Sequence, residues 1–534
     1  MIMNLHNLQN KTDWEAAGIS LPRYDISATV ARTRTSPTWV HFGAGNIFRG
    51  FIAALQQQLL NEGQAESGII VAETYDHEII GKIYVPYDNL TMNVILNQDS
   101  TISCEVIASV AEALNVNDQA SRLRTTEIFE SPLLQMVSFT ITEKGYAIAD
   151  ANGAPSPLAK ADMENGPEQA RHAMGILAAL LLKRYLVGAH PIAAVSMDNC
   201  SRNGEKLKTG VVEIAKTWVA KGFADSGFIS YLDDERKVSF PWSMIDKITP
   251  RPSKIVEDNL ARKGIEEMAP IITNKNTYIA PFVNAERPQY LVIEDKFPNG
   301  RPAFEKCNVF MTDRDTVNKV ERMKVTTCLN PLHTAMSVYG CLLGYSLICE
   351  EMKDPDIVAL IHRLGYIEGL PVVTDPGILS PKSFIDEVIQ ERLSNPFMPD
   401  DPRRIATDTS QKVGIRFGET IKSYIKTRRN LADLISIPLS IAGWMRYLLA
   451  IDDEGNKMEV SSDPMKDDLQ AKLEGVKWND PSSYNGQLQH ILANPVIFGV
   501  DLTATILSER IEKMFLDLLS GPGAVRAALR KYLT

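Results

Sequence analysis

A short glycine turn between an apolar segment and an amphipathic segment constrains the fold of this chain most strongly. The segment TWVHF at 38–42 has the character of a buried strand, GAGN at 43–46 is a tight turn, and IFRGFIAALQQQLL at 47–60 has helical spacing of apolar residues. A second strand is predicted in GIIVAET at 68–74. Strand, helix and parallel strand in this order form the unit that builds right-handed parallel sheets.

The turn itself points to a ligand. It is a relative of the GxGxxG pattern in which the last glycine comes two positions later. Two glycines allow the backbone to approach a pyrophosphate closely, and the following helix offers free N–H groups and a favourable dipole. We therefore predict a dinucleotide site, in preference to a plain structural turn. Its predicted residues are Gly43, Gly45, Asn46, Phe48 and Arg49.

An acidic residue near the end of the second strand indicates which dinucleotide fits. Asp76, or alternatively Glu73, stands where a carboxylate accepts hydrogen bonds from the ribose hydroxyls of adenosine. The same carboxylate would repel a 2′-phosphate. The sequence therefore favours NAD over NADP, and the alternative for each acid is a solvated position in a loop.

Further strands and helices follow the first unit. Strands are predicted at 135–142 and 191–197, and Pro167 is predicted to open a helix between them because proline fits the first helical turn. Asn203 is predicted to cap the helix that follows the second of these strands. The strand, loop and helix pattern of the N-terminal unit is thus repeated.

The character of the sequence changes near Asp313. Beyond this residue, apolar side chains recur at helical spacing and strand-like alternation nearly disappears. We therefore predict an α/β, Rossmann-like domain with a parallel-rich sheet over residues 1–312, and a mainly α-helical domain over 313–534. The active site is expected between the two domains.

Composition disfavours several classes of protein. The 66 acidic and 56 basic side chains give a net charge of −10, which disfavours nucleic acid or an anionic membrane as a partner. Neither a signal peptide nor a membrane span is predicted, so a cytoplasmic location is expected. The six cysteines form no CxxC pair and the eight histidines no HxH or HExxH motif, so no disulfide framework and no metal site are predicted. The sequence carries no signal for the oligomeric state.

A group of polar residues opens the helical region: Glu321, Lys324, Asn330 and His333. A secondary-alcohol dehydrogenase without a metal needs a proton acceptor and hydrogen-bond donors for the developing alkoxide. A buried lysine suits this task, because desolvation lowers the pKa of an amine. The alternative is that these residues lie on the surface or cap a helix.

Six segments occur in an order that carries a family resemblance: HFGAGNIFRG, TEKGY, SMDNCSRNGE, MIDKITPRP, LNPLH and RIATDTSQK. From about Val40 to Asp463 the chain resembles the polyol-specific long-chain dehydrogenases, a family that includes mannitol dehydrogenases. MIDKITPRP, similar to the family signature VDRITP, is the most specific segment. The resemblance implies a metal-independent, NAD-dependent oxidoreductase that acts on a sugar-derived ketone or secondary alcohol.

The resemblance also implies roles for the polar residues near the start of the helical region. Lys324 is similar to the catalytic acid/base, and Asn199 and Asn330 are similar to the pair that holds the substrate oxygen. His333 resembles the histidine that orients the substrate, and Glu321 resembles the acid that controls proton exit.

The spacing of the catalytic lysine departs from that family. Relatives usually have this lysine five residues before the asparagine, whereas Lys324 stands six residues before Asn330. Because Glu321 keeps its spacing to Lys324, the additional residue is predicted to lie after the lysine.

Substrate-binding residues are implied in the same way. Asp246 resembles a residue that lines the site, and Arg404 and Lys412 resemble the basic pair that binds distal substrate groups; Arg416 is a further cation or a surface residue. The basic pair suits a carboxylate, which favours reduction of a hexuronate such as D-fructuronate to D-mannonate. Interconversion of D-fructose and D-mannitol and reduction of tagaturonate are the enzymatic alternatives, because neutral-polyol members carry the same pair. An inactive dinucleotide-binding sensor is the alternative from another class.

Overall fold

The computed structural model describes residues 1–150 and 153–533, and the chain divides into two compact units. Unit 1 contains Met1–Asn97 and Thr101–Asn318, and unit 2 contains Gln98–Ser100 and Lys319–Thr534. Within the described residues, no helix combines the length and apolar character that crossing a membrane requires.

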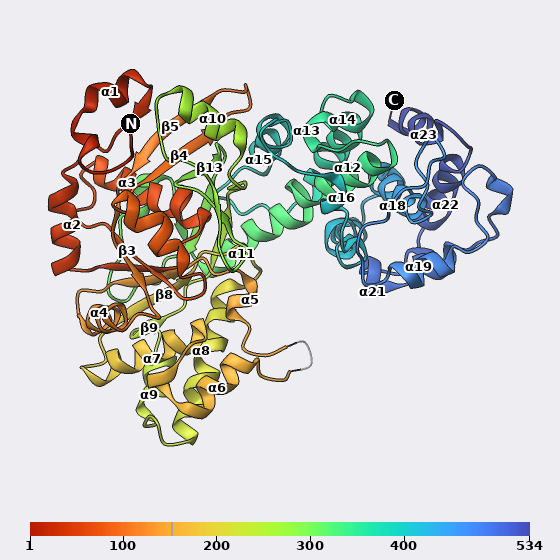
Figure 1. Cartoon of the computed structure of the whole chain (residues 1–534). Coiled ribbons are helices and arrows are strands. Elements are labelled where there is room, and N and C mark those ends of the chain that lie inside the picture. Colours follow the sequence, from red (N-terminus) through yellow and green to blue (C-terminus); the bar gives the residue numbers. More distant parts are fainter. Residues whose placement is uncertain (151–152, 534) are drawn as a thin grey trace. The chain divides into compact units, whose positions relative to one another are not determined.

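A six-stranded sheet forms the centre of unit 1 (Figure 1). Its strand order is β6-β3-β2-β7-β8-β9, and every neighbouring pair is parallel. The strands are β2 (Trp39–Phe42), β3 (Ile69–Glu73), β6 (Val110–Asn115), β7 (Met136–Phe139), β8 (Ile192–Ser196) and β9 (Val238–Ser239). This is the strand order of a doubly wound dinucleotide-binding sheet, whose direction of winding changes between β2 and β7. The predicted Rossmann-like, parallel fold is confirmed.

Both faces of this sheet are buried, as the continuously apolar strands require. One face packs against α4 (Gln119–Glu130), α7 (Ala173–Leu186) and α8 (Asn203–Ala220), and α7 and α8 lie side by side near β8 (Figure 1). The other face packs against α3 (Ala53–Asn61) and a second sheet. The remaining helices of unit 1 are α1 (Lys11–Ala16), α2 (Ile26–Thr35), α5 (Glu143–Tyr146), α6 (Pro157–Asn165), α9 (Gly227–Asp233) and α10 (Lys254–Arg262).

Three smaller sheets complete unit 1. The three-stranded sheet has the order β10-β14-β15, from β10 (Ser243–Asp246), β14 (Tyr290–Glu294) and β15 (Phe310–Thr312). The four-stranded sheet has the order β1-β5-β4-β13, from β1 (Ile19–Ser20), β4 (Thr91–Leu96), β5 (Ile102–Ile107) and β13 (Phe282–Glu286). A two-stranded sheet pairs β11 (Ile271–Ile272) with β12 (Tyr278–Ile279).

The predicted helix at Pro167 begins later than expected. Pro167–Gln169 forms a short 3₁₀ turn, and α7 starts only at Ala173. The cause is Asp162, whose carboxylate accepts hydrogen bonds from the backbone amides of Arg171 (2.9 Å) and His172 (2.8 Å) and so holds the chain out of a helix.

The predicted cap at Asn203 is wrong. Arg202, in the left-handed conformation (φ 52°), takes the capping position, and Asn203 is the first residue of α8. Its amide instead donates to the carbonyls of Asp198 (3.0 Å) and Ser243 (2.9 Å). Asn203 therefore joins the loop after β8 to β10.

Unit 2 is helical. Beyond Thr312, the only β-structure in the described chain consists of isolated β-bridges. Its helices are α12 (Asn330–Leu342), α13 (Ile348–Glu351), α14 (Pro355–His362), α15 (Pro381–Glu387), α16 (Pro402–Ile405), α17 (Glu419–Lys426), α18 (Ser436–Tyr447), α19 (Lys466–Lys472), α20 (Gln489–Leu492), α21 (Pro495–Phe498), α22 (Leu507–Leu518) and α23 (Ala524–Leu533), with α11 (Arg314–Met323) leading into them. The almost entirely buried α12 packs against α14, α16 and α18 (Figure 1). The prediction of a mainly α-helical C-terminal region is confirmed.

A carboxyl group is buried against α12. Both side-chain oxygens of Glu351 lack a hydrogen-bond partner among the described residues, and a Cβ at Gly340 would lie 2.0 Å from Glu351 Oε1. Burial, assisted by the negative charges of Asp354 and Asp401, raises the pKa of Glu351 to about 9. The folded protein therefore holds this group as a neutral acid at pH 7.

Replacing Glu351 with glutamine is expected to stabilise the protein at alkaline pH. The pKa in the folded state lies above that of the unfolded chain, so the contribution of Glu351 to stability is complete below about pH 4.5 and is lost as the pH rises toward 9. Glutamine cannot ionise. Urea unfolding at pH 8 should show a gain of at least about 2 kcal/mol, with little gain at pH 5. Equal effects at both pH values would contradict an elevated pKa.

Candidate active site

The glycine turn follows β2 at the point where the winding of the sheet changes direction. Gly43 has φ +106°, and a Cβ there would lie only 2.2 Å from the carbonyl oxygen of Thr140, so only glycine fits. Around Gly45 a Cβ would meet no atom within 4 Å. The first glycine thus allows close packing on the loop after β7, while the second leaves open space at the start of a helix, where backbone N–H groups lack intrahelical partners.

The two acids predicted to hold a ribose are buried at the end of β3. Glu73 accepts hydrogen bonds from the backbone amides of Ala44 (2.8 Å), Tyr75 (2.8 Å) and Asp76 (3.1 Å), which ties the glycine turn to β3. Asp76 accepts a hydrogen bond from Thr273 Oγ1 (2.6 Å). Neither acid is a solvated loop residue, and Glu73 is the one bonded to the glycine turn.

Phe48 and Arg49 differ in how they fit the predicted site. The ring of Phe48 is fully buried and stacks on His41 at 4.3 Å, so its side chain belongs to the core and only its backbone remains for a ligand. Arg49 is 1% exposed, and burial lowers its pKa to about 10. Its Nε donates to Thr91 Oγ1 (3.2 Å), but its buried Nη2 has no hydrogen-bond partner in the described part of the chain. A nearby anion would satisfy this nitrogen.

Asn199 lies in the loop after β8, at the same edge of the sheet as the glycine turn. The preceding residue, Asp198, accepts hydrogen bonds from the backbone amides of Ile141 (2.8 Å) and Thr142 (3.2 Å) and from the Tyr146 hydroxyl (2.5 Å). Burial raises the pKa of Asp198. These bonds join the TEKGY and SMDN segments, so Asp198 and Tyr146 position the loop that carries Asn199. Neither was predicted as a site residue, although both lie in the quoted segments.

Asp246 is the last residue of β10 and is buried. The chain directly after it is held by Glu286, which accepts a hydrogen bond from the Ile248 amide (2.7 Å) and donates its own amide to the Ile248 carbonyl (3.0 Å). The signature segment MIDKITP is therefore a strand end fixed by a buried acid of β13.

Lys324 is 3% exposed and begins a π-helical turn, Lys324–Cys328, between α11 and α12. The Leu329 amide donates to the Lys324 carbonyl (3.1 Å), a bond that spans five residues where an α-helix spans four. A π turn accommodates one additional residue in a helical path. The additional residue predicted between Lys324 and Asn330 thus lies in a π turn. Glu321 precedes it on α11 and is partly exposed.

Asn330 and His333 lie in the first turn of α12. The Nε2 atom of His333 is buried and lacks a hydrogen-bond partner among the residues that the structure describes. Burial lowers the pKa of His333 to about 4; Arg416 and Arg392 act in the same direction and Asp400 opposes them. At neutral pH the ring is uncharged and can exchange a hydrogen bond with a substrate hydroxyl.

Both members of the predicted basic pair already have partners in the protein. The exposed Arg404 forms an ion pair with Asp400. The Lys412 ammonium donates to the carbonyls of Ile405 (3.2 Å) and Thr407, and burial lowers its pKa.

Arg416 is the cation with unused hydrogen-bonding capacity. Its Nη1 donates to Thr334 Oγ1, its one side-chain hydrogen bond within the described chain, and burial lowers its pKa to about 10. Arg416 also lowers the pKa of Lys412 and of His333. In this group of cations, Asp400 pairs with Arg404, and Asp408 and Asp463 act on Lys412, whereas Arg416 forms no ion pair within the described chain. An anionic group bound beside His333 would balance its charge.

Polar side chains rather than metal ligands characterise these sites. In residues 1–150 and 153–533, no three His, Cys, Asp or Glu side chains gather as metal ligands. The available groups are amides, a neutral imidazole, a buried lysine and buried guanidinium groups. Such groups can polarise a carbonyl oxygen, transfer a proton to it and hold an anionic substrate.

Both units match domain models built from known proteins of a single family. Residues 37–306 match the mannitol dehydrogenase Rossmann domain and residues 316–519 the mannitol dehydrogenase C-terminal domain. A relative from Thermotoga maritima, D-mannonate oxidoreductase, is 50% identical over 536 residues, which cover 99% of each chain.

Two solved structures are similar along the whole chain. The mannitol 2-dehydrogenase of Pseudomonas fluorescens, in a ternary complex with NAD and D-mannitol, is 26% identical with a TM-score of 0.70 and covers 100% of this chain and 99% of its own. A substrate-free D-sorbitol dehydrogenase, 24% identical, has the same fold with a TM-score of 0.81 over 99% of this chain and 100% of its own. The two domain models and the relative that is half identical over the full length establish that the chain belongs to the mannitol dehydrogenase family.

Proposed function

We propose that the chain is an NAD-dependent oxidoreductase that reduces D-fructuronate with NADH to D-mannonate, and that it acts in the cytoplasm. The relative from Thermotoga maritima supports the substrate, because it is named D-mannonate oxidoreductase and is half identical along its full length. All six cysteines are unpaired, as is usual in a reducing compartment. We assign cofactor binding to residues 1–312 and substrate binding to 313–534.

The residues around the glycine turn fit a dinucleotide. The open space at Gly45, the free amides of the helix start and the unsatisfied Nη2 of Arg49 suit a pyrophosphate. Glu73 and Asp76 stand where the adenosine ribose of NAD would bind, although both also bond to the protein. When bound, NADH supplies the hydride for the ketone carbon.

Residues of the chain then donate a proton to the substrate oxygen and stabilise the negative charge that develops on it. Lys324 donates a proton to this oxygen during reduction, and the amides of Asn199 and Asn330 stabilise the developing negative charge. His333, neutral and with an unsatisfied Nε2, orients the substrate through a hydroxyl. Glu321 passes the replacement proton from solvent to Lys324, and Asp246 contacts the substrate.

The observation that carries the choice of a hexuronate is Arg416, a cation near His333 that forms no ion pair among the described residues. Arg404 and Lys412 already have protein partners, whereas Arg416 has a buried guanidinium with a single neutral partner. A buried charge without a counterion is costly, and a substrate carboxylate would remove that cost. A neutral ketose such as fructose offers no such group.

Oxidation of NADH measured with a panel of ketoses tests this function. With D-fructuronate, tagaturonate, fructose and xylulose, we expect kcat/KM to favour fructuronate by more than about a hundredfold, or about 2.7 kcal/mol of transition-state binding. NADPH in place of NADH is the cofactor control and should be used poorly. Fructose as the best substrate would make the protein a mannitol 2-dehydrogenase, and NADH binding without any turnover would indicate a sensor.

A further inference from the structure

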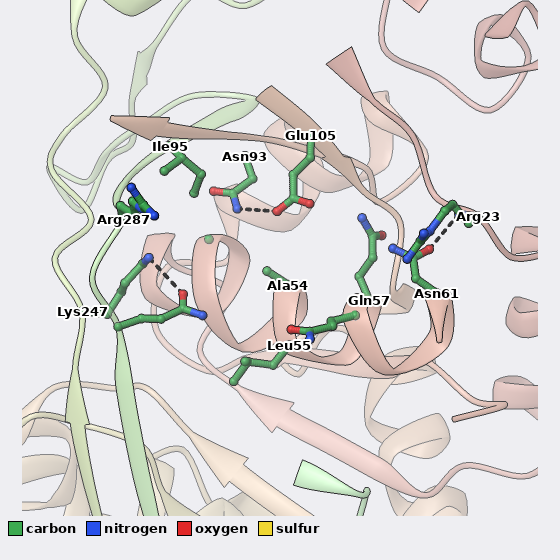
Figure 2. A pocket seen from close by; sticks show the side chains of 13 residues that line it. Arg23, Ala54, Leu55, Gln57, Asn61, Asn93, Ile95, Glu105, Lys247 and Arg287 are labelled. Atoms are coloured by element: carbon green, nitrogen blue, oxygen red, sulfur yellow. Dashed lines mark hydrogen bonds between the residues drawn. The ribbon is translucent and has the colours of Figure 1, made fainter. Parts of the chain in front are cut away.

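Unit 1 contains a polar pocket that includes Gly50, the last glycine of the glycine pattern, but neither Gly43 nor Gly45. It has a volume of about 400 Å³ and lies between α3 and the four-stranded sheet (Figure 2). Helix α3 forms its floor, and residues of β4 and β5 form the opposite wall. No residue proposed for cofactor or substrate binding lines it.

The lining of this pocket is positively charged. It contains Arg23, Lys247 and Arg287 but a single carboxylate, Glu105, in a protein whose net charge is −10. The guanidinium groups of Arg23 and Arg287 form neither an ion pair nor a hydrogen bond within the described residues. The Lys247 ammonium donates to Gln289 Oε1 (3.1 Å) and to the Glu286 carbonyl, and it also interacts electrostatically with the carboxyl group of Glu105.

The cations stand at opposite ends of the pocket. Figure 2 shows Lys247 and Arg287 at one end and Arg23, beside Asn61, at the other. Arg23 is linked to Asn61 through its backbone amide (2.7 Å), so its side chain remains available. A ligand with an anionic group at each of its ends could pair with the cations at both ends of the pocket.

The middle of the pocket requires a hydrogen-bond donor. Asn93, which is 1% exposed, donates from Nδ2 to Glu105 Oε1 (3.0 Å), and its buried Oδ1 has no partner among the described residues. In Figure 2 the Asn93 side chain projects into the pocket next to Glu105. Two neighbouring oxygen acceptors between positive ends match the hydroxyl groups of a polyol chain.

We propose that this pocket is a second ligand site, which binds a small polyhydroxylated dianion such as a sugar acid that also carries a phosphate. The anionic ends pair with Arg23 at one end and with Lys247 and Arg287 at the other. The hydroxyl groups between them donate to Asn93 Oδ1 and Glu105. This site is independent of the proposed reaction, whose substrate cations lie in unit 2.

Calorimetric titration of the full chain with 6-phospho-D-gluconate tests the site. The double variant Arg23→Gln/Arg287→Gln removes both unpaired guanidinium groups, and Ala54→Phe fills the pocket from α3, where Ala54 is half-buried. Arg34→Gln is the matched control, because Arg34 is an exposed arginine of α2 whose side chain has no partner among the described residues.

We expect saturable binding to the wild type and to Arg34→Gln, and binding weakened at least about tenfold in both pocket variants. Inorganic phosphate and D-gluconate, titrated separately, should each bind more weakly than the combined probe. Equal affinity in all four proteins would mean that the probe binds elsewhere, including the catalytic site, and would overturn the proposal. So would phosphate alone binding as tightly as the probe, or no saturation at about 10 mM.

Discussion

Lys324→Ala is expected to lower turnover of D-fructuronate by about a thousandfold, because general acid catalysis by a positioned side chain contributes on the order of 10²–10⁴. The dissociation constant of NADH should stay the same, since the proposed cofactor residues lie around the glycine turn of unit 1. Steady-state kcat and fluorescence titration with NADH measure the two quantities. Lys324→Arg keeps the positive charge but cannot release a proton near neutral pH, so it should be nearly as inactive as the alanine variant.

Lys426→Ala is the matched control for this experiment. Lys426 is an exposed lysine in the last turn of α17, and its replacement should leave kcat unchanged. Because Lys324 is buried, circular dichroism of Lys324→Ala should show native helix content before the loss of turnover is interpreted. A well-folded Lys324→Ala variant that keeps its activity would assign the acid/base role to another residue.

The elements that the sequence predicted well depend on contacts between near neighbours. Strand β2, the turn at Gly43 and the helix after it are specified by a run of apolar residues, by glycine and by helical spacing within about twenty positions. Alternating strand and helix segments then suffice to indicate a parallel sheet. The prediction of a Rossmann-like domain with a parallel-rich sheet follows from these local signals.

Features that depend on distant residues were missed. Asn203 has the composition of a helix cap, but its amide bonds to Ser243, forty positions away, and this tertiary contact prevails over the local preference. Strand β13 pairs with β4 although the two are almost 200 residues apart in sequence, so no local pattern reveals this pairing.

The π turn at Lys324 is an intermediate case. The comparison of spacings indicated one additional residue, but the period of apolar side chains does not distinguish a π turn from a loop. The bond from the Leu329 amide to the Lys324 carbonyl identifies the turn, which ends just before α12 begins at Asn330. The sequence likewise identified Arg416 only as a further cation near the predicted basic pair. Its burial and its single hydrogen-bond partner are properties of the fold.

Arg416→Gln is expected to lower kcat/KM for D-fructuronate by about a thousandfold, or about 4 kcal/mol, because removing one partner of a buried charge pair costs about 2–5 kcal/mol. Glutamine can still donate a hydrogen bond to Thr334, so the local packing of α12 is preserved. For fructose, which has no carboxylate, the same variant should change kcat/KM by less than about threefold. Steady-state kinetics with both substrates measure the ratio.

Arg403→Gln provides the comparison that separates local charge from net charge. Arg403 lies in α16 next to Arg404, but it is exposed and paired with Asp401, so its removal changes the net charge equally without touching Arg416. The Arg403→Gln variant should have the same ratio of kcat/KM for fructuronate to kcat/KM for fructose as the wild type. If Arg416→Gln reduced activity on both substrates equally, Arg416 would support the fold of the site and the carboxylate would be bound by Arg404 and Lys412. A selective loss would instead assign recognition of the substrate carboxylate to Arg416.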